Sequence, residues 1–82
     1  KFFPAANYGG TGTLKAFASV FGRASFIPTG GVSTSNLGDY LGLPNVPAVG
    51  GSWMVPPKAI DAGDFATVQS LSAEAVAAAA AL

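Results

Sequence analysis

Two adjacent glycines, Gly30 and Gly31, follow an apolar segment and precede a polar stretch that begins at Ser33. This order is typical of a buried strand that leads through a tight turn to the start of a helix. Glycine lets the backbone approach a ligand closely, and a helix N-terminus offers unpaired N–H groups and a positive dipole end. Together these features are typical of an anion site, most often for phosphate. An ordinary turn whose glycines only adopt positive φ values would explain the same residues.

The glycine pair recurs about every twenty residues, at Gly9-Gly10, Gly30-Gly31 and Gly50-Gly51. Each pair follows an apolar segment and precedes a stretch with helical character. The sequence predicts strands at 1–4, 24–28 and 46–49, and helices at 13–21, 34–41, 57–60 and 65–82. Strand, turn and helix repeated three times predict parallel βα units with right-handed crossovers.

Helix boundaries and apolar faces follow from capping residues and from spacing. We expect Thr13, Ser33 and Asp64 to be N-caps. An apolar stripe predicts that the first helix packs inward through Leu14, Phe17, Ala18 and Phe21. The second helix is expected to turn Leu37, Tyr40 and Leu41 inward. The last helix is expected to turn inward Phe65, Val68, Leu71 or Ser72, Ala75 and Val76.

The composition excludes several classes of function. Half of the 82 residues are hydrophobic and 10% are charged, with no net charge, so the chain is not expected to bind nucleic acid or a membrane surface. No apolar run approaches the ~20 residues that span a bilayer. The absence of Cys and His excludes disulfides, most zinc sites and Ser-His-Asp triads, so we expect no metal site. A chain without Cys also fits the cytoplasm.

Three parallel strands do not make a closed domain, because two edges stay unpaired and a barrel needs about eight strands. We therefore expect an α/β fold that is the C-terminal part of a (β/α)8 TIM barrel, with a second chain or the remaining N-terminal part of the barrel completing it. In that fold phosphate commonly binds between the loops after strands seven and eight. These loops would be residues 29–33 and 50–53.

Three motifs in register carry a resemblance to a family. They are Lys1-Phe2-Phe3-Pro4-Ala5, Pro28-Thr29-Gly30-Gly31-Val32-Ser33 and Gly50-Gly51-Ser52-Trp53. The chain resembles the 2-keto-3-deoxy-6-phosphogluconate (KDPG) and 4-hydroxy-2-oxoglutarate (KHG) aldolases, class I aldolases of the Entner–Doudoroff pathway. The resemblance implies that residues 1–82 are the C-terminal part of a single TIM-barrel aldolase domain, with strands six to eight and their helices. It also implies a homotrimer and a cytoplasmic enzyme without metal or organic cofactor.

The resemblance assigns roles to individual residues. It makes Lys1 the Schiff-base lysine, Phe3 and Thr29 substrate-binding residues, and Gly30, Gly31, Gly51 and Ser52 phosphate-binding residues. The family's acid/base glutamate and its carboxylate-binding arginine belong to earlier strands and have no counterpart here. Ala6 departs from the family, since many relatives carry a glutamate there. Trp53 is expected to pack in the core, and the four acidic residues Asp39, Asp61, Asp64 and Glu74 are expected to be solvated.

The implied reaction cleaves 2-dehydro-3-deoxy-6-phosphogluconate to pyruvate and glyceraldehyde 3-phosphate. A neutral lysine amine attacks the ketone, and apolar surroundings beside Phe3 would favour the neutral form. Without a general base, this chain alone is expected to be nearly inactive. Two alternatives stay open: a non-catalytic phosphate-binding βα fragment with an idle Lys1, and another phosphate-binding barrel enzyme such as an isomerase or synthase. The preferred keto acid also stays open, although Gly51-Ser52 favours a phosphorylated one.

Overall fold

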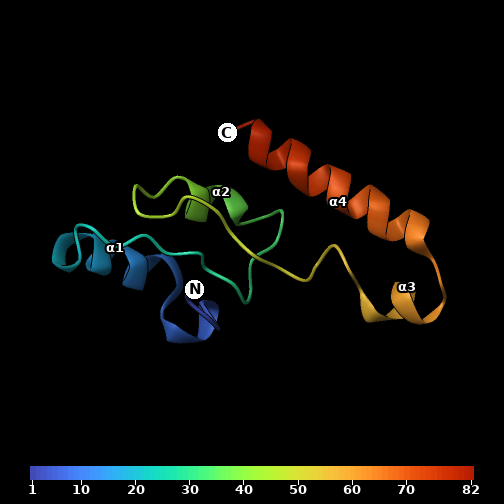
Figure 1. The fold of residues 1–82 in the computed structure, drawn as a ribbon, viewed down its shortest axis with the longest axis horizontal. Helices are drawn as coiled ribbons and strands as arrows, with labels where there is room; N and C mark the ends of the chain where they lie inside the picture. Colours follow the sequence, from blue (N-terminus) through green and yellow to red (C-terminus); the bar gives the residue numbers. More distant parts are fainter.

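Four α-helices and one 3-10 helix form the regular structure of the chain, and the computed structural model describes all 82 residues (Figure 1). The elements are η1 (Ala6–Tyr8), α1 (Gly10–Val20), α2 (Leu37–Leu41), α3 (Pro57–Asp61) and α4 (Phe65–Ala80). The helices follow one another in the predicted order: α1 begins at the second residue of the first glycine pair, α2 follows the second pair and α3 follows the third. None of them is long and apolar enough to cross a membrane.

Three extended segments run parallel to one another in the order of the sequence. Phe2 forms a parallel bridge with Pro28, and Thr29 forms one with Gly50. The Phe2 N–H donates to Ile27 O (3.0 Å), the Thr29 N–H donates to Phe2 O (2.9 Å), and the Gly50 N–H donates to Pro28 O (2.9 Å). The predicted parallel order is therefore present.

The three predicted strands are nevertheless wrong as regular strands, because the pairing stops at isolated bridges. A physical reason lies in the sequence. Pro4, Pro28 and Pro47 fall within or beside the three segments, and proline has no N–H to donate to a ladder. In addition, the outer segments each have one neighbour only, so half of their backbone groups have no strand to pair with.

The prediction that Thr13 caps the first helix is wrong. α1 begins at Gly10, three residues earlier, and its N-cap is Gly9 with φ 101°. Gly9 and Gly10 both have positive φ, which glycine adopts without steric cost, so the chain turns into the helix within the pair. The Thr13 hydroxyl donates instead to Tyr8 O (2.6 Å), which fixes η1 against the start of α1.

Ser33 is also not the cap of α2. Asn36 is its N-cap, and α2 begins at Leu37 because residues 33–36 first form a turn in which Leu37 N–H donates to Ser33 O (2.9 Å). The prediction for Asp64 is confirmed. Its carboxylate accepts from Thr67 N–H (3.2 Å) and from the Thr67 hydroxyl (2.6 Å), and α4 follows directly.

The buried core is small and lies between α1, α2 and the extended segments. It contains the predicted inward residues Leu14, Leu37 and Tyr40, and it is completed by Ala5, Val32 and Val46. Nine of the 82 residues are buried. The radius of gyration of 13.9 Å exceeds the about 11.7 Å expected of a compact domain of this length, and the molecule measures 45 × 26 × 18 Å. Much of the apolar surface therefore lies outside this core.

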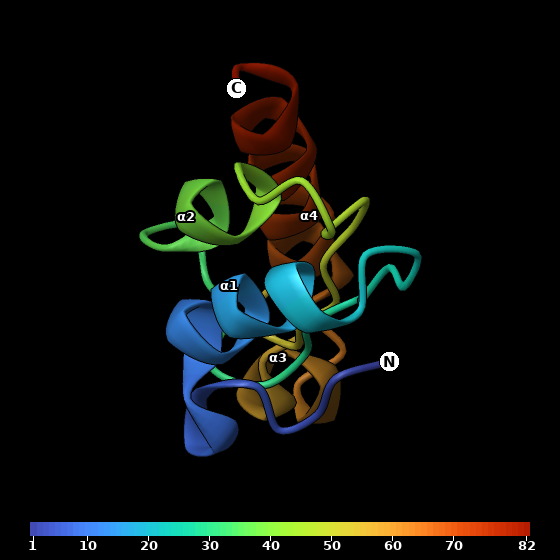
Figure 2. The same ribbon diagram turned by 90° about the vertical axis from the view of Figure 1, so that its left-hand side faces the viewer.

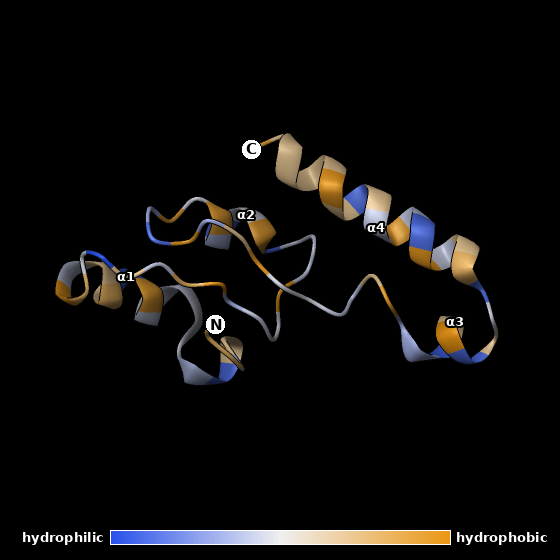
Figure 3. Cartoon of the chain, in the orientation of Figure 1, coloured by the Kyte–Doolittle hydropathy of each residue, from blue (hydrophilic) through white to orange (hydrophobic).

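α4 does not bury the face predicted for it. No residue of α4 is buried, and Phe65 and Val76 are 65% and 70% exposed. Figure 2 shows α4 extending beyond the other elements toward the C-terminus, and Figure 3 shows hydrophobic residues on every helix, interrupted by polar ones along α4. The helix packs mainly on α2 and α3, and no second layer covers its other faces.

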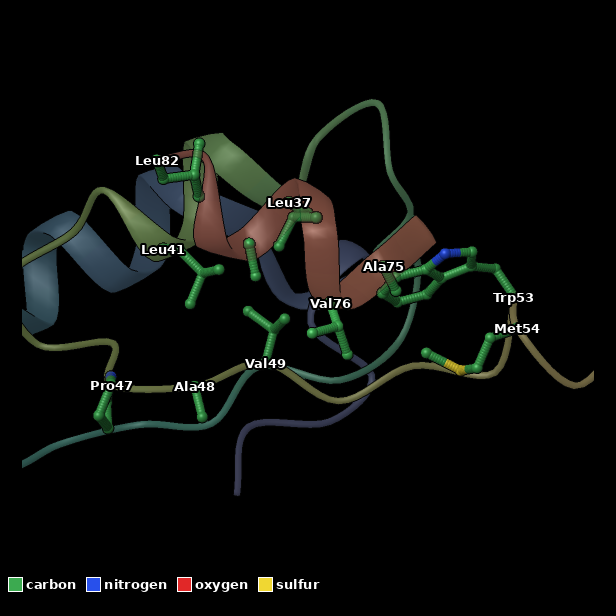
Figure 4. Close-up of a pocket in the computed structure, with 11 residues that line it drawn as sticks. Leu37, Leu41, Pro47, Ala48, Val49, Trp53, Met54, Ala75, Val76 and Leu82 are labelled. Atoms are coloured by element: carbon green, nitrogen blue, oxygen red, sulfur yellow. The ribbon is translucent and has the colours of Figure 1, made fainter. Parts of the chain in front are cut away.

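An apolar groove lies between α2, residues 47–54 and α4. Its volume is about 520 Å³, and ten of its eleven lining residues are hydrophobic. Figure 4 shows Val49 and Val76 near its middle, with Trp53 and Met54 at one end and Leu41 and Leu82 at the other. The groove adjoins the core through Leu37, and most of its other apolar side chains lie outside the core cluster.

Candidate active site

The turns that follow the extended segments meet at one end of the molecule. Parallel pairing of Thr29 with Gly50 places the carboxyl ends of the second and third segments side by side. The first segment joins them because Ala5 N–H donates to Thr29 O (2.8 Å) and Ala6 N–H donates to Gly30 O (3.2 Å). The motifs that carry the resemblance are thus neighbours in space as well as being in register along the sequence.

The Gly30-Gly31 turn has both features that were predicted for glycine. Gly30 and Gly31 have φ values of 102° and 77°, which favour glycine. A Cβ at Gly30 would lie 2.9 Å from Pro4 Cα, and a Cβ at Gly31 would lie 2.6 Å from Ala6 Cβ. The close approach in this structure is therefore an approach to the first segment, so the two glycines are needed for packing whether or not they also contact a ligand.

Asn36 holds this turn, and the sequence analysis did not identify it. Its Nδ2 donates to Gly31 O (2.8 Å), and its Oδ1 accepts from Ser33 N–H (2.8 Å). The second bond is the same reach back over three residues that a capping box makes. The signal in the sequence is an amide side chain three residues after Ser33, which competes with the serine hydroxyl for the same backbone groups.

Four backbone N–H groups at the site have no acceptor in the chain. They belong to Gly30, Gly31, Gly51 and Ser52, the residues predicted to bind phosphate. The predicted helix N-terminus does not contribute in the expected way, since α2 begins at Leu37 and the Leu37 N–H is already bonded to Ser33 O. What the site offers to an anion is a set of loop N–H groups from two adjacent turns, an arrangement that binds anions in many proteins.

Lys1 and Phe3 lie on the same side of the first segment. The Lys1 Nζ is 5.9 Å from the centroid of the Phe3 ring, and both residues are exposed. Phe2 points to the other side and packs against Phe17, with ring centroids 5.8 Å apart. The alternation expected of an extended segment is therefore observed. The apolar surroundings that would desolvate the amine are not supplied by these 82 residues.

Thr29 lies beneath the third segment. Its hydroxyl oxygen is buried without a hydrogen-bond partner, and a Cβ at Gly50 would lie 2.7 Å from it. Trp53 is half-buried and packs against the core, as predicted, with its six-membered ring against Gly51. Gly50 and Gly51 therefore leave room for the Thr29 and Trp53 side chains, which fixes the course of the third turn.

The acidic residues do not belong to these turns. Asp39, Asp61, Asp64 and Glu74 are all exposed, as predicted, and no group of acidic residues gathers to form a metal site. The Thr67 hydroxyl, followed by the Thr67 N–H, lowers the pKa of Asp64, which is a capping effect at α4. The paired segments thus carry a lysine, an aromatic ring and free loop N–H groups, and none of these turns contains a carboxylate.

Comparison with known proteins gives one consistent family. The family model for KDPG and KHG aldolases matches residues 1–71. A 2-dehydro-3-deoxy-phosphogluconate aldolase of Pseudomonas aeruginosa is 54% identical over 76 residues, which are 93% of this chain and 34% of that protein. The KHG/KDPG aldolase of Escherichia coli K12 is 49% identical over 76 residues, 93% of this chain and 36% of that protein.

Comparison with solved structures leads to the same family. A KDPG aldolase from Legionella pneumophila, captured with pyruvate as a covalent carbinolamine intermediate, superposes with a TM-score of 0.81 at 48% identity. The match covers 85% of this chain and 34% of that chain. A second aldolase structure superposes with a TM-score of 0.73 at 38% identity and covers 96% of this chain and 35% of that one. The chain therefore spans about a third of the length of the relatives it matches.

Proposed function

The chain belongs to the KDPG and KHG aldolase family, and from this premise we propose that it is the part of a class I aldolase that carries the Schiff-base lysine. The complete enzyme cleaves 2-dehydro-3-deoxy-6-phosphogluconate to pyruvate and glyceraldehyde 3-phosphate. The observation that carries the proposal is that the segment with Lys1 and Phe3 pairs in parallel with the segment that leads into the second turn. The N–H groups of Gly30 in this turn and of Gly51 in the next one have no acceptor. This combination suits a keto acid with a phosphate at its far end.

The reaction begins when the neutral Lys1 amine attacks the C2 ketone of the substrate. The carbinolamine loses water and becomes an iminium, which accepts the electron pair of the C3–C4 bond as that bond breaks. The aldehyde leaves as glyceraldehyde 3-phosphate, and the remaining enamine is protonated and hydrolysed to pyruvate and free Lys1. Phe3 and Thr29 line the keto-acid end. The base that removes the C4 hydroxyl proton is not among these residues, so it comes from the rest of the barrel.

The substrate phosphate binds to the two glycine turns. In this proposal the N–H groups of Gly30, Gly31, Gly51 and Ser52 donate to its oxygens, and the Ser52 hydroxyl adds another donor. The Asn36 side chain supports them, because its bonds to Gly31 O and Ser33 N–H hold the second turn. Binding at the phosphate holds the substrate over the paired segments, the first of which carries Lys1.

The remaining N-terminal part of the barrel is the partner that completes this site. Its support is the apolar surface that this chain leaves uncovered, which includes ten large hydrophobic residues with exposed fractions from 40% to 71%. Phe3 and Ile27, on adjacent extended segments, are 62% and 43% exposed. Parallel strands are normally buried on both faces, so these residues are expected to be covered by neighbouring strands and helices. The resemblance further suggests a cytoplasmic homotrimer, which sedimentation of the complete protein tests.

Reductive trapping tests the proposal. The complete protein is treated with pyruvate and borohydride, digested and analysed by mass spectrometry, with fragmentation that places the adduct on a single side chain. We expect a reduced pyruvyl adduct on the Lys1 Nζ. Lys1→Ala should lose both the adduct and turnover, whereas Lys15→Ala, an exposed lysine on α1, should keep both. An adduct on Lys15 or Lys58, or full turnover in Lys1→Ala, would contradict the proposal.

A non-catalytic phosphate-binding role is the second candidate, and the exposure of Lys1 favours it. In this role the lysine is idle and the turns bind an anion without chemistry. Phosphate binding occurs in both cases and does not separate them. The absence of any trapped adduct on the complete protein, together with retained phosphate binding, would favour this second role.

A further inference from the structure

The first glycine pair, Gly9-Gly10, has no part in the function proposed above, although it opens the helix α1. Its N-cap, Gly9, has no side chain, and the first turn of α1 contains no acidic residue. The N–H groups of Thr11 and Gly12 are therefore left without an acceptor in the chain. These are the second and third residues of the helix, whose N–H groups an N-cap oxygen normally accepts from.

A polar pocket of about 400 Å³ lies at this helix end. Its wall includes Gly10 and Thr11 of α1, Ala6 of η1, and Asp39 and Tyr40 of α2. It is not the groove beneath α4, which is apolar and has different lining residues. The pocket thus joins three elements that pack around the first and second turns.

Tyr40 provides the second observation that points to a ligand. The residue is 4% exposed, yet its hydroxyl has no hydrogen-bond partner among the side-chain and backbone groups of the chain. A Cβ at Gly10 would lie 3.2 Å from the Tyr40 hydroxyl oxygen, so this oxygen lies at the N-terminus of α1. The ring is buried, but the hydroxyl oxygen is not among the fully buried unpartnered atoms, so it remains open to the pocket that Tyr40 lines, where a ligand can accept its hydrogen bond.

We propose that this pocket binds a small monocarboxylate. The two oxygens of a carboxylate accept from the N–H groups of Thr11 and Gly12 and from the Tyr40 O–H. The bound carboxylate thereby takes the place of the missing N-cap side chain, at the end of the helix where the dipole favours negative charge. This site is separate from the substrate phosphate turns, whose donors are other N–H groups.

Charge favours a monoanion over phosphate. No Lys or Arg lines the pocket, and the Asp39 carboxylate lies in its wall. Coulomb repulsion from Asp39 is twice as large for a dianion as for a monoanion at the same distance, while the helix end offers only about half a unit of positive charge. A carboxylate therefore fits the pocket better than a doubly charged phosphate.

The pocket also adjoins the second turn. Asn36 forms part of its wall and donates to Gly31 O (2.8 Å). A carboxylate bound beside Asn36 is therefore expected to change the environment of the Gly31 N–H, even though it does not bind there. This neighbouring effect gives the test a second reporter.

Acetate titration of the complete, assembled protein tests the site. Amide ¹H–¹⁵N spectra are recorded at constant ionic strength, with chloride as the reference anion. We expect saturable shifts of the Thr11 and Gly12 amides with acetate and none with chloride. Tyr40→Phe keeps the buried ring and should weaken acetate binding about tenfold, because one charge-assisted hydrogen bond is lost. Asp39→Asn should tighten it several-fold.

Ala6→Glu provides the matched occupancy control. Its carboxylate enters the pocket from the chain itself, so the variant should no longer respond to acetate. Inorganic phosphate should shift the Gly30 and Gly51 amides more than that of Gly12. The proposal would be overturned if chloride produced the same amide shifts as acetate. It would also be overturned if Tyr40→Phe left the acetate affinity unchanged. Neither result would affect the trapping experiment at Lys1, so the two proposals fail separately.

Discussion

Gly30→Ala is the sharpest test of how the second turn is built. Gly30 has φ 102°, and a Cβ there would lie 2.9 Å from Pro4 Cα and 3.2 Å from Ala5 N. The positive φ costs an alanine about 1–2 kcal/mol. The contact adds about 1–3 kcal/mol, because backbone rather than a flexible side chain must move. We therefore expect Gly30→Ala to lower the free energy of unfolding by about 2–5 kcal/mol.

Two other glycines separate these contributions. Gly63 has φ 67° and nothing within 4 Å of a Cβ, so Gly63→Ala should cost only the φ term of about 1–2 kcal/mol. Gly22 has no positive φ and equally open space, so Gly22→Ala should lie between neutral and about 1 kcal/mol more stable. The expected order of stability is therefore Gly22→Ala, then Gly63→Ala, then Gly30→Ala.

Urea unfolding of the complete protein, followed by circular dichroism at one protein concentration, measures all three variants. The same samples are titrated with inorganic phosphate, which should bind more weakly to Gly30→Ala alone, because the hydrogen bonds from Ala5 and Ala6 hold this turn in place. If Gly30→Ala were no less stable than Gly63→Ala, the contact with Pro4 would not destabilise an alanine at position 30. The close approach to Pro4 would then not be the reason for glycine in this turn.

Three further predictions concern the core and the helix ends. Leu14→Ala should lower the free energy of unfolding in urea by about 2–5 kcal/mol, because Leu14 is fully buried. Lys15→Ala, at the exposed neighbouring residue, should change it by no more than about 0.5 kcal/mol, and equal effects of the two variants would contradict the core assignment. Asn45→Ala should lower the free energy of unfolding by about 1–3 kcal/mol in the same assay, because the buried Asn45 Nδ2 donates to Leu14 O (3.0 Å). An unchanged free energy of unfolding would show that this hydrogen bond does not stabilise the fold. Asp64→Ala should speed amide exchange at Thr67 by removing the cap of α4. The lowered pKa of Asp64 means that its stabilising contribution is present above the usual aspartate pKa and is lost as pH falls through the lowered value. The protection of the Thr67 amide, taken relative to its intrinsic exchange rate at each pH, should therefore fall in acid in the parent protein and not in Asp64→Ala.

Local signals in the sequence predicted the helices well. Asp64 predicted the start of α4 because the cap and the N–H groups that it satisfies lie within three residues of each other. The same reasoning failed at Thr13 and Ser33, where a competing local feature decided the outcome. At Thr13 a pair of glycines with positive φ started the helix earlier, and at Ser33 a turn held by Asn36 delayed it.

Strand pairing and burial depend on partners far away in the sequence, and this is where prediction failed. The apolar segments correctly predicted a parallel order, but the prolines and the absence of outer neighbours limited pairing to the bridges at Phe2 and Thr29. In α4 the spacing of apolar residues was correct, yet Val76 stays 70% exposed because no second layer packs on it. Periodicity predicts which residues share a face, but it does not say what covers that face.

The two parts of the candidate site, the glycine turn and Lys1, therefore depend on different parts of the protein. The turn at Gly30 and Gly31 is set by contacts within these 82 residues, namely the approach to Pro4 and the hydrogen bond from Asn36. The reactivity of Lys1 instead requires apolar surroundings that the exposed Lys1 does not find in this chain. A variant that loosens barrel closure without touching the turns should accordingly lose pyruvate trapping before it loses phosphate binding. Loss of both at the same denaturant concentration would mean that the turns, too, depend on the complete barrel.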